Sequence, residues 1–482
     1  MNKTVLHDGD DGVLLIVRDV KKKKEKKHGR VERPTRAPVH VVYGGADRFN
    51  AGTPRKLGDI ALRTLETYAP NFIEFAEAVG LPGTEAISAS QKDPDGLEKF
   101  FLTAPENLKT EDHPAWLAAT IYHRTRAKLQ IEPVEDFRID FEDGYGFRPD
   151  DEEDRDAAAA AMELASALRE HTITPFSGFR VKAYSEETRE RAKRTLNIFL
   201  DTFLDATDRT LPENFVVTLP KVADKKEVAE LCRDLKKIEK KAHLNEGSIG
   251  IEIMVEHPLA IIDRKGDFAL KGLVKASRGR CVAAHFGAYD YTAGLGIAAS
   301  HQGLDHPACQ FARQMMLAAL TPLGVRLSDS VTTQLPVPAH KGADLNEHQV
   351  ADNRSAVHSG WKVHFENVRR SMAGGFYQSW DLHPNQLIAR YAAVYSFFLE
   401  NEQTQAARLR AFLDKATQAT LTGNAFDDAA SAAGIVNFFR QGLDCGAWSE
   451  DEIKAVTGLT AGELRNDSFK ALAETATQAS AG

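Results

Sequence analysis

Two carboxylates in the sequence stand where they could bind a metal ion together. Glu256 ends an apolar, β-branched segment, IGIEIMVEH, and Asp290 follows the next such segment, CVAAHFG. If these segments are neighbouring parallel strands, their carboxyl ends meet, so the two side chains can approach each other across 34 sequence positions. Two carboxylates, with water and substrate oxygens, are a ligand set that Mg²⁺ or Mn²⁺ accepts. The alternative to metal binding is that these carboxylates form ordinary ion pairs with Arg or Lys, and the spacing alone does not decide between the two.

Other strand-like segments also end in charged or hydrogen-bonding residues, and the whole set indicates one site. Arg180 is the candidate anion anchor, because a planar guanidinium binds a carboxylate with two parallel hydrogen bonds. The alternative for Arg180 is a salt bridge to Glu142 or Asp143 from the neighbouring strand, which can coexist with substrate binding. The residues expected to bind substrate are Arg180, Glu142, Asp143, Lys221, Asp381 and His383.

Lys221 would permit a second mechanism. A lysine shielded from water in a barrel can form a Schiff base with a carbonyl substrate, and such an aldolase needs no metal. We therefore keep a Schiff-base aldolase as the rival enzyme. A barrel that has lost catalysis and serves as a binding module is the non-enzymatic alternative.

The elements that must position these residues are eight short apolar segments separated by longer amphipathic ones. Between them, 154–171, 185–203 and 223–242 read as amphipathic helices. Eight strands alternating with helices predict an α/β fold, a closed (β/α)₈ or TIM barrel. A doubly wound open sheet is disfavoured, because no G-x-G-x-x-G follows the first strand. The eight segments span residues 39–46, 137–144, 179–184, 215–221, 249–257, 281–287, 325–331 and 376–384.

Three regions follow from this pattern. Residues 1–38 form an N-terminal extension whose lysine run, KKKKEKK, is best interpreted as a solvated loop. Residues 39–398 form the barrel, with additional helices expected within 51–130. Residues 399–482 are Ala-rich and are expected to form a C-terminal helical domain, with turn signals at TGN and CGAWSED.

The composition excludes several classes of protein. Sixty-one basic residues against 69 acidic ones give a net charge of −8, which does not suggest nucleic-acid binding. No segment approaches the roughly 20 apolar residues that cross a bilayer, and no signal peptide is recognisable, so we expect a cytoplasmic protein that is not bound to membranes. Homo-oligomers are left open. The widely spaced cysteines indicate neither a zinc site nor a disulfide framework; they are Cys232, Cys281, Cys309 and Cys445.

Six short motifs follow one another on consecutive expected strands: DFEDG, FR, LPK, VEHP, G-x-Y-D-Y and W-x-x-HP. In this order, across residues 39–451, the chain resembles the citrate lyase β-subunit-like superfamily of HpcH/HpaI aldolases, together with the malate synthases. HFGAYDY is similar to the G-R-W-D-Y strand of malate synthases, which implies that Asp290 is a metal ligand. VEHPLA is similar to their I-E-T segment, which implies the same for Glu256.

The C-terminal region adds to this resemblance. FDDAASAAGIVNFFRQG, residues 426–442, is similar to the malate-synthase segment whose Asp deprotonates the acetyl group. The resemblance thus assigns a catalytic base to Asp428 or its neighbour Asp427. The alternative is that FDDAA only begins a helix, with Asp427 as its N-cap.

Residues and resemblance together suggest a Mg²⁺-dependent carbon–carbon lyase or synthase of the aldol or Claisen type. Its expected substrate is a small 2-oxo or 3-hydroxy acid, with an acyl-CoA thioester left open as a substrate. In this hypothesis Arg180 stabilises negative charge on a substrate oxygen, and Glu142 and Asp143 orient Arg180 or metal-bound water.

Overall fold

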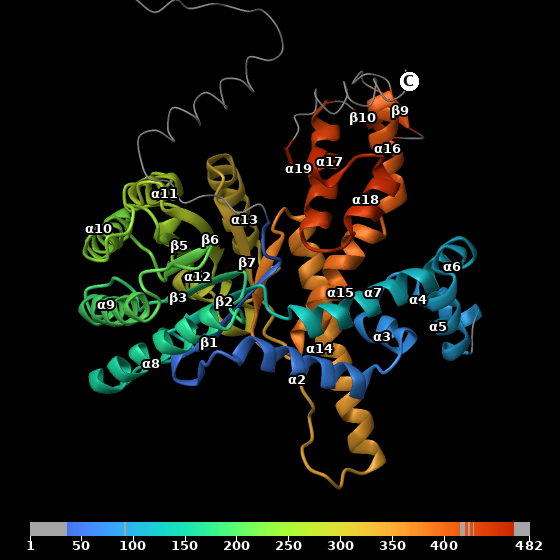
Figure 1. Ribbon diagram of the computed structural model, residues 1–482, viewed down its shortest axis with the longest axis horizontal. Helices are drawn as coiled ribbons and strands as arrows, with labels where there is room; N and C mark the ends of the chain where they lie inside the picture. Colours follow the sequence, from blue (N-terminus) through green and yellow to red (C-terminus); the bar gives the residue numbers. More distant parts are fainter. Residues whose placement is uncertain (1–35, 91–92, 415–419, 423–424, 428, 467–482) are drawn as a thin grey trace, which may run out of the picture. The chain divides into compact units, whose positions relative to one another are not determined.

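The computed structural model describes residues 36–90, 93–414, 420–422, 425–427 and 429–466. Eight strands close into a barrel in the order of the sequence, which confirms the predicted fold (Figure 1). Each of the eight segments expected from the sequence contains or overlaps one strand. The strands are β1 His40–Gly45, β2 Asp136–Asp140, β3 Phe176–Arg180, β4 Phe215–Leu219, β5 Gly250–Val255, β6 Cys281–Phe286, β7 Arg326–Val331 and β8 Gln378–Asp381.

The parallel register brings the carboxyl ends of successive strands together. Arg180 at the end of β3 pairs with Thr218 of β4, and Leu219 of β4 pairs with Ile253 of β5. Val255 of β5 then pairs with Phe286 of β6. Strands β2 to β5 are buried along their whole length, which explains why they read as apolar runs. Residues that follow these strands therefore converge at one end of the barrel.

The chain divides into two compact units, each of which contains part of the barrel. Of the described residues, the first unit holds 43–51 and 137–328, and the second holds 36–42, 52–136 and 329–466. Strands β3 to β6 lie wholly in the first unit and β8 lies wholly in the second. The boundaries predicted from the sequence, 1–38, 39–398 and 399–482, stay a prediction.

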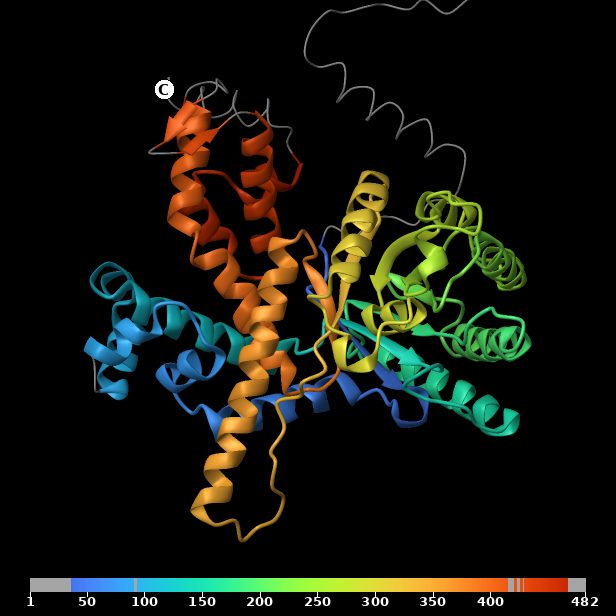
Figure 2. The same cartoon turned by 180° about the vertical axis from the view of Figure 1, so that it is seen from behind.

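Helices of the first unit pack against its strands, and those predicted within 154–171, 185–203 and 223–242 are present. Phe199 of α9 stacks on Phe179 of β3 with ring centroids 4.1 Å apart, which anchors the helix to the strand. Helices α8 and α9 lie side by side in both ribbon views (Figures 1 and 2). The helices are η1 Ala46–Arg48, α8 Asp150–Arg169, α9 Arg189–Ala206, α10 Lys225–Lys241, η2 Pro258–Ala260, α11 Leu270–Ala276, α12 Ala288–Gly294, η3 Ala299–His301, α13 Pro307–Leu320 and η4 Thr321–Leu323.

The second unit is mostly helical, and the helices expected within 51–130 are present. Helix α15 is buried on nearly every side, packing against α14 and α7, because its sequence QLIARYAAVYSFFL is apolar around most of its circumference. The helices are α2 Thr53–Tyr68, α3 Phe72–Val79, α4 Thr84–Ser90, α5 Pro94–Thr103, α6 Pro105–Glu111, α7 His113–Ile131, α14 Glu347–Ala373, α15 Gln386–Leu399, α16 Glu402–Asp414, α17 Ala429–Asp444, α18 Glu450–Thr457 and α19 Ala461–Asn466.

The sequence led us to expect a purely helical C-terminal region, but this region also contains two short strands. Strands β9, Thr420–Thr422, and β10, Ala425–Asp427, pair in antiparallel register around the TGN turn signal. The two strands are only three residues long each, and the Ala-rich sequence around them gave no signal for a hairpin. The remainder of this region forms helices α16 to α19.

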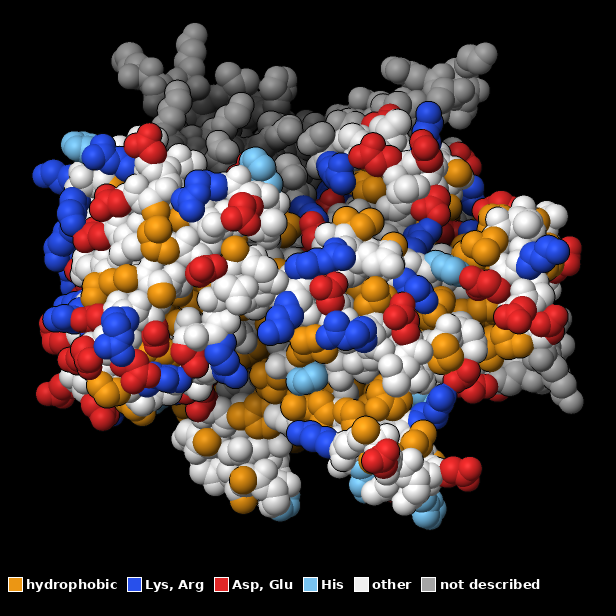
Figure 3. All heavy atoms as spheres, turned by 60° about the horizontal axis from the view of Figure 1, so that its bottom comes forward, with side chains coloured by type: hydrophobic (Ala, Val, Ile, Leu, Met, Phe, Trp, Pro, Cys, Tyr) orange, Lys and Arg blue, Asp and Glu red, His pale blue; other side chains and the backbone are white. Residues whose placement is uncertain are grey.

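Two surface properties bear on partners. Among the described residues, no helix combines the length and apolar character needed to cross a membrane. On the face drawn in Figure 3, basic and acidic side chains are interspersed, so this face offers no extended patch of one sign.

Candidate functional site

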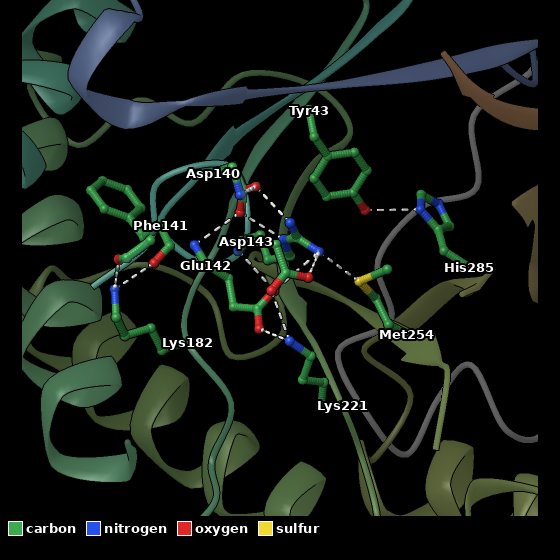
Figure 4. A network of polar contacts seen from close by, with 12 residues as sticks. Tyr43, Asp140, Phe141, Glu142, Asp143, Lys182, Lys221, Met254 and His285 are labelled. Carbon is green, nitrogen blue, oxygen red and sulfur yellow. Dashed lines mark hydrogen bonds and ion pairs between the residues drawn. The ribbon is translucent and has the colours of Figure 1, made fainter. Parts of the chain in front are cut away.

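The centre of the site is a buried ion pair between the ends of β2 and β3 (Figure 4). Arg180 donates from Nε to Oδ1 of Asp140 at 2.6 Å and from Nη2 to Oδ2 at 2.5 Å, and both side chains are 1% exposed. Burial alone would lower the pKa of Arg180, but Asp140 holds it above its usual value. The two-bond geometry fixes the plane of the guanidinium, so its remaining edge has a defined direction.

Glu142 and Asp143, the partners expected for Arg180, lie on the Nη1 side. Nη1 is 3.3 Å from Oε2 of Glu142 and 4.0 Å from Oδ2 of Asp143. Both pairings are therefore longer than the one with Asp140. Arg180 also directs Nη1 toward the sulfur of Met254 at 3.3 Å, and sulfur is a weak acceptor.

The loop that carries Glu142 and Asp143 is held from two sides. Asp140 accepts hydrogen bonds from the backbone N–H of Glu142 at 3.0 Å and of Gly144 at 2.8 Å. A side chain at position 144 would collide with Asp140, since its Cβ would lie 2.6 Å from Oδ2. From the other side, Lys182 donates to the carbonyl oxygen of Phe141 at 2.7 Å. The loop conformation is thus fixed by buried polar contacts.

Lys221 completes this group of charges. It follows β4 in a left-handed backbone conformation, with φ of 50°, and its Nζ contacts the carboxylates of Glu142 and Asp143, the latter at 2.8 Å. Partial burial would lower the pKa of Lys221, but the two carboxylates raise it. Burial raises the pKa of Glu142, whereas hydrogen bonds from Lys221 hold that of Asp143 below its usual value. Lys221 is therefore a charged ammonium in this arrangement.

Glu256 is a buried carboxyl group with few neighbours that favour its charged form. It follows β5, is 3% exposed, and accepts a hydrogen bond from the backbone N–H of Lys221 at 2.7 Å. Burial raises the pKa of Glu256 to about 8, the charges of Asp290 and Glu142 act in the same direction, and Arg180 opposes them. Asp290 stands exposed in the first turn of α12, after β6. The two candidate ligands thus act on each other electrostatically at the carboxyl ends of neighbouring strands.

Beneath Arg180 lies Tyr43 of β1. The guanidinium carbon of Arg180 is 4.7 Å from the centre of the Tyr43 ring, a cation–π contact. The Tyr43 hydroxyl lies 3.0 Å from Nδ1 of His285 (Figure 4). It also lies 3.2 Å from Oε1 of Glu252. Tyr43 therefore joins the Arg180 layer to a second polar layer deeper in the barrel.

Glu252 is the centre of that deeper layer, pointing into the barrel as strand alternation predicts. It accepts hydrogen bonds from Nε and Nη2 of Arg138, at 3.2 and 2.9 Å, and from the hydroxyl of Thr218 at 2.7 Å. Its oxygen Oε2 lies 2.8 Å from Nε2 of His285. Burial alone would raise the pKa of Glu252, but Arg138 and His285 hold it well below its usual range.

Asp381 and His383, also expected to bind substrate, belong to the second unit. Asp381 is fully buried and accepts from His40 at 2.8 Å, from His364 at 2.9 Å and from Arg390 at 2.7 Å. These partners hold the pKa of Asp381 well below its usual range despite burial. His383 accepts from the backbone N–H of Asn385 at 3.2 Å. A substrate could reach the Asp381 carboxylate only by displacing one of its partners.

The expected catalytic base cannot be placed. Asp428 lies outside the described residues, and Asp427 ends β10 with a side chain that is not described. Their catalytic role stays a prediction.

Sequence reasoning missed two members of the site. Asp140 was overlooked beside Glu142 and Asp143, although Asp136, Arg138 and Asp140 alternate along a buried strand, a period-two signal for charges that face the barrel interior. Tyr43 gave no charge signal, and its contacts depend on three other strands.

Within the described part of the chain, no three His, Cys, Asp or Glu side chains form a preformed metal-binding cluster. Mg²⁺ commonly keeps several waters and binds through one or two carboxylates, so Glu256 and Asp290 match its needs.

Comparisons with known proteins give the following findings. The family model described as a domain of unknown function, DUF6986, matches residues 18–472. No curated protein matches the sequence. Among solved structures, a citrate lyase from Burkholderia xenovorans LB400 is 19% identical, with a TM-score of 0.49, over 70% of this chain and 92% of that chain.

Two further structures represent the other named groups. The CitE protein from Mycobacterium tuberculosis, in complex with magnesium, acetoacetate and coenzyme A, is 17% identical, with a TM-score of 0.42, over 67% of this chain and 95% of that one. A malate synthase from Haloferax volcanii is 14% identical, with a TM-score of 0.44, over 90% of this chain and 98% of that one. These are the groups that the order of the sequence motifs resembles, and the likeness concerns the fold alone.

Proposed function

The chain belongs to the DUF6986 family of unknown function, and for it we propose a Mg²⁺-dependent carbon–carbon lyase or synthase of the aldol or Claisen type. The substrate is a small 2-oxo or 3-hydroxy acid, and an acyl-CoA thioester is a candidate second substrate. The site is built from the ends of β2 to β6, where barrel enzymes place their chemistry.

The observation that carries this proposal is the carboxylate of Glu256. It is buried, lies near the second carboxylate of Asp290, and has a pKa raised to about 8 by burial and by neighbouring negative charge. A buried carboxylate in such surroundings is costly unless it gains a cation. A Mn²⁺ or Mg²⁺ ion held by Glu256 and Asp290 would relieve both the desolvation and the repulsion.

When bound, the metal would supply Lewis-acid polarisation of a substrate carbonyl. Arg180 would bind a substrate carboxylate or the oxygen on which negative charge develops, from the Nη1 side of its guanidinium. Its other edge is fixed by Asp140, so little orientation is lost when the substrate binds. Glu142 and Asp143 would keep Lys221 in place beside Arg180 and would exchange partners as an anion enters.

The Schiff-base alternative is less well supported. An amine must lose its proton to attack a carbonyl, and nucleophilic lysines are usually activated by a lowered pKa. Here Glu142 and Asp143 raise the pKa of Lys221. We therefore assign Lys221 to charge balance and substrate positioning.

A base is needed to remove a C–H proton if the enzyme works in the synthetic direction. Asp428, or its neighbour Asp427, remains our candidate on the resemblance of its segment. A base held apart from the metal keeps its basicity, which a carboxylate on a C-terminal segment would provide. The diagnostic variant is Asp428→Asn, for which loss of a base predicts a fall in kcat of about 10²–10⁴-fold.

The test of the proposed function is a substrate screen. Purified protein is incubated with Mg²⁺ and a panel of 2-oxo acids, with acetyl-CoA for synthesis, and with 3-hydroxy acids or their CoA thioesters for cleavage. Free thiol and 2-oxo acid are recorded. We expect turnover that EDTA abolishes and Mg²⁺ restores. Turnover that survives EDTA, with covalent trapping of substrate by borohydride, would favour the Schiff-base enzyme. No turnover with any of the panel would favour the binding module.

A further inference from the structure

We propose that Tyr43 is the acid–base residue that handles the substrate hydroxyl proton, and that His285 and Glu252 hold it in that role. The proposal rests on the proposed carbon–carbon chemistry and adds a residue to it. The three side chains come from β1, β6 and β5, and their polar atoms lie 2.8 to 3.2 Å from one another.

Glu252 fixes the charge of this group. It is fully buried, and two hydrogen bonds from Arg138 and one from Thr218 are directed at its oxygens. Burial raises the pKa of Glu252, but Arg138 and His285 hold it well below its usual range. Glu252 is therefore an anion that can only accept hydrogen bonds.

The Glu252 anion decides which nitrogen of His285 carries a proton. Nε2 lies 2.8 Å from Oε2 of Glu252, a distance at which an unprotonated nitrogen would be repelled by the carboxylate oxygen. In the proposed arrangement Nε2 carries a proton and Nδ1 is the acceptor. The partner of Nδ1 is the Tyr43 hydroxyl at 3.0 Å.

It follows that the Tyr43 proton points down into the barrel. Its neighbours there, Nδ1 of His285 and Oε1 of Glu252, are both acceptors. A phenolic oxygen can accept a hydrogen bond as well as donate one, so it can act toward a substrate hydroxyl. Tyr43 is also partly exposed, whereas Glu252 and His285 are buried, so Tyr43 alone of the three can touch substrate. Its ring against Arg180 places it beside the anion anchor.

The proton balance of a cleavage step can be written in full. The substrate hydroxyl gives its proton to the Tyr43 oxygen while Tyr43 gives its own proton to Nδ1 of His285. The electron pair left on the substrate oxygen forms the new carbonyl, the adjacent carbon–carbon bond breaks, and its electrons pass to the other fragment as an enolate. The imidazolium is stabilised by Glu252 and later loses its proton to solvent, and the enolate carbon gains a proton from solvent. Synthesis follows the same path backwards.

Tyr43→Phe is the sharpest variant, because it keeps the ring beneath Arg180 and removes only the hydroxyl. We expect kcat to fall by about 10²–10⁴-fold, with KM and Mg²⁺ affinity unchanged. The matched control is Tyr122→Phe, which removes a hydroxyl bonded at 2.7 Å to the carbonyl oxygen of Pro70, and which should leave kcat unchanged. Wild-type kcat in Tyr43→Phe would overturn the proposal and leave the carbon–carbon chemistry standing.

A double variant tests whether Tyr43 and His285 act along one proton path, which we call the relay, or contribute to catalysis independently. His285→Asn should lower kcat as Tyr43→Phe does, and combining the two should cause no further loss, because both remove the same proton path. Multiplicative losses would contradict the relay. A wild-type protein without turnover in the substrate screen would instead refute the proposed function on which the relay depends.

The relay also has a readout that needs no turnover. In ¹⁵N spectra of the histidine side chains, His285 should show a protonated Nε2 and an unprotonated Nδ1, assigned by the signal lost in His285→Asn. Tyr43→Phe should shift the Nδ1 resonance, and Tyr122→Phe should not. A protonated Nδ1 in the wild type would overturn the proposal, since Tyr43 could then not donate to it.

Discussion

Glu256 in the first unit and Asp381 in the second are both buried carboxylates at or just beyond the end of a barrel strand, yet their surroundings are opposite. Asp381 accepts from two histidines and an arginine, and its pKa is well below its usual range. Glu256 accepts one backbone hydrogen bond from Lys221 and is exposed to the negative charge of Asp290 and Glu142, so its pKa is raised.

In our proposal this difference distinguishes a carboxylate that stabilises the fold from one that binds a cation. Asp381 forms hydrogen bonds or ion pairs with His40, His364 and Arg390, and these contacts stabilise one arrangement of β8, α14 and α15. Around Glu256 the surroundings disfavour the charged carboxylate, so its ionisation costs free energy that a bound cation would offset. The comparison is open to test because each carboxylate can be neutralised without a large change in size.

The largest expected effect is on catalysis in Glu256→Gln. Removing the charge should lower kcat by at least about 10²–10³-fold, the scale seen when one electrostatic contributor is lost. The free energy of unfolding should not fall, because a costly buried charge disappears. The matched control is Glu239→Gln, which neutralises a carboxylate paired with Arg280 in the same unit and should destabilise the protein without affecting kcat in the folded state.

Asp381→Asn should give the reverse pattern. Breaking a buried ion pair costs about 3–5 kcal/mol, because His40, His364 and Arg390 lose their common partner. Chemical denaturation should show this loss, while the Mg²⁺ affinity of the folded protein stays as in the wild type. Lost Mg²⁺ binding with unchanged stability would mean that Asp381 belongs with Glu256, as its predicted role in substrate binding would require.

Arg180→Lys tests the anion anchor within the first unit. Lysine keeps the charge but cannot bond both oxygens of Asp140 and still present a fixed edge to the substrate. We expect kcat/KM to fall by about 10- to 10²-fold, the equivalent of one charge-assisted hydrogen bond of about 1.5–3 kcal/mol. Steady-state kinetics measure this change, and kinetics identical to the wild type would remove Arg180 from the site.

The smallest expected effect is on the pH dependence of protein stability, through His364 of the second unit. Burial lowers the pKa of His364, an effect that Arg390 and His40 reinforce and Asp381 opposes. The unfolded chain then binds more protons than the folded one below the ordinary histidine pKa of about 6.5, so stability falls as pH drops through this window. His364→Gln should flatten the slope by up to about 1.4 kcal/mol per pH unit, measured by denaturation between pH 7.5 and 5. An unchanged slope would mean that His364 does not titrate on unfolding.

The fold could be predicted from the sequence because most barrel strands are largely buried and several are rich in apolar residues, such as HVVYGG and FVVTL. The ends of these runs also predicted which residues converge. What the sequence could not distinguish is how the charges pair. In DFEDG three carboxylates stand within four positions, and only the register of β2 shows that Asp140, rather than Glu142 or Asp143, holds Arg180. The sequence likewise did not show how Asp381 is paired, because His40 is distant in the sequence and Arg390 lies on the following helix.

The central claim, that Glu256 and Asp290 bind a divalent cation, is tested most directly by titrating chelator-treated protein with Mg²⁺ and with Mn²⁺, followed by calorimetry. The account predicts one saturable site for each chain, and a loss of affinity of more than about 10²-fold in both Glu256→Gln and Asp290→Asn. Glu239→Gln and Asp381→Asn should bind as the wild type does. Absence of saturable binding in the wild type, or equal affinity in all four variants, would contradict it.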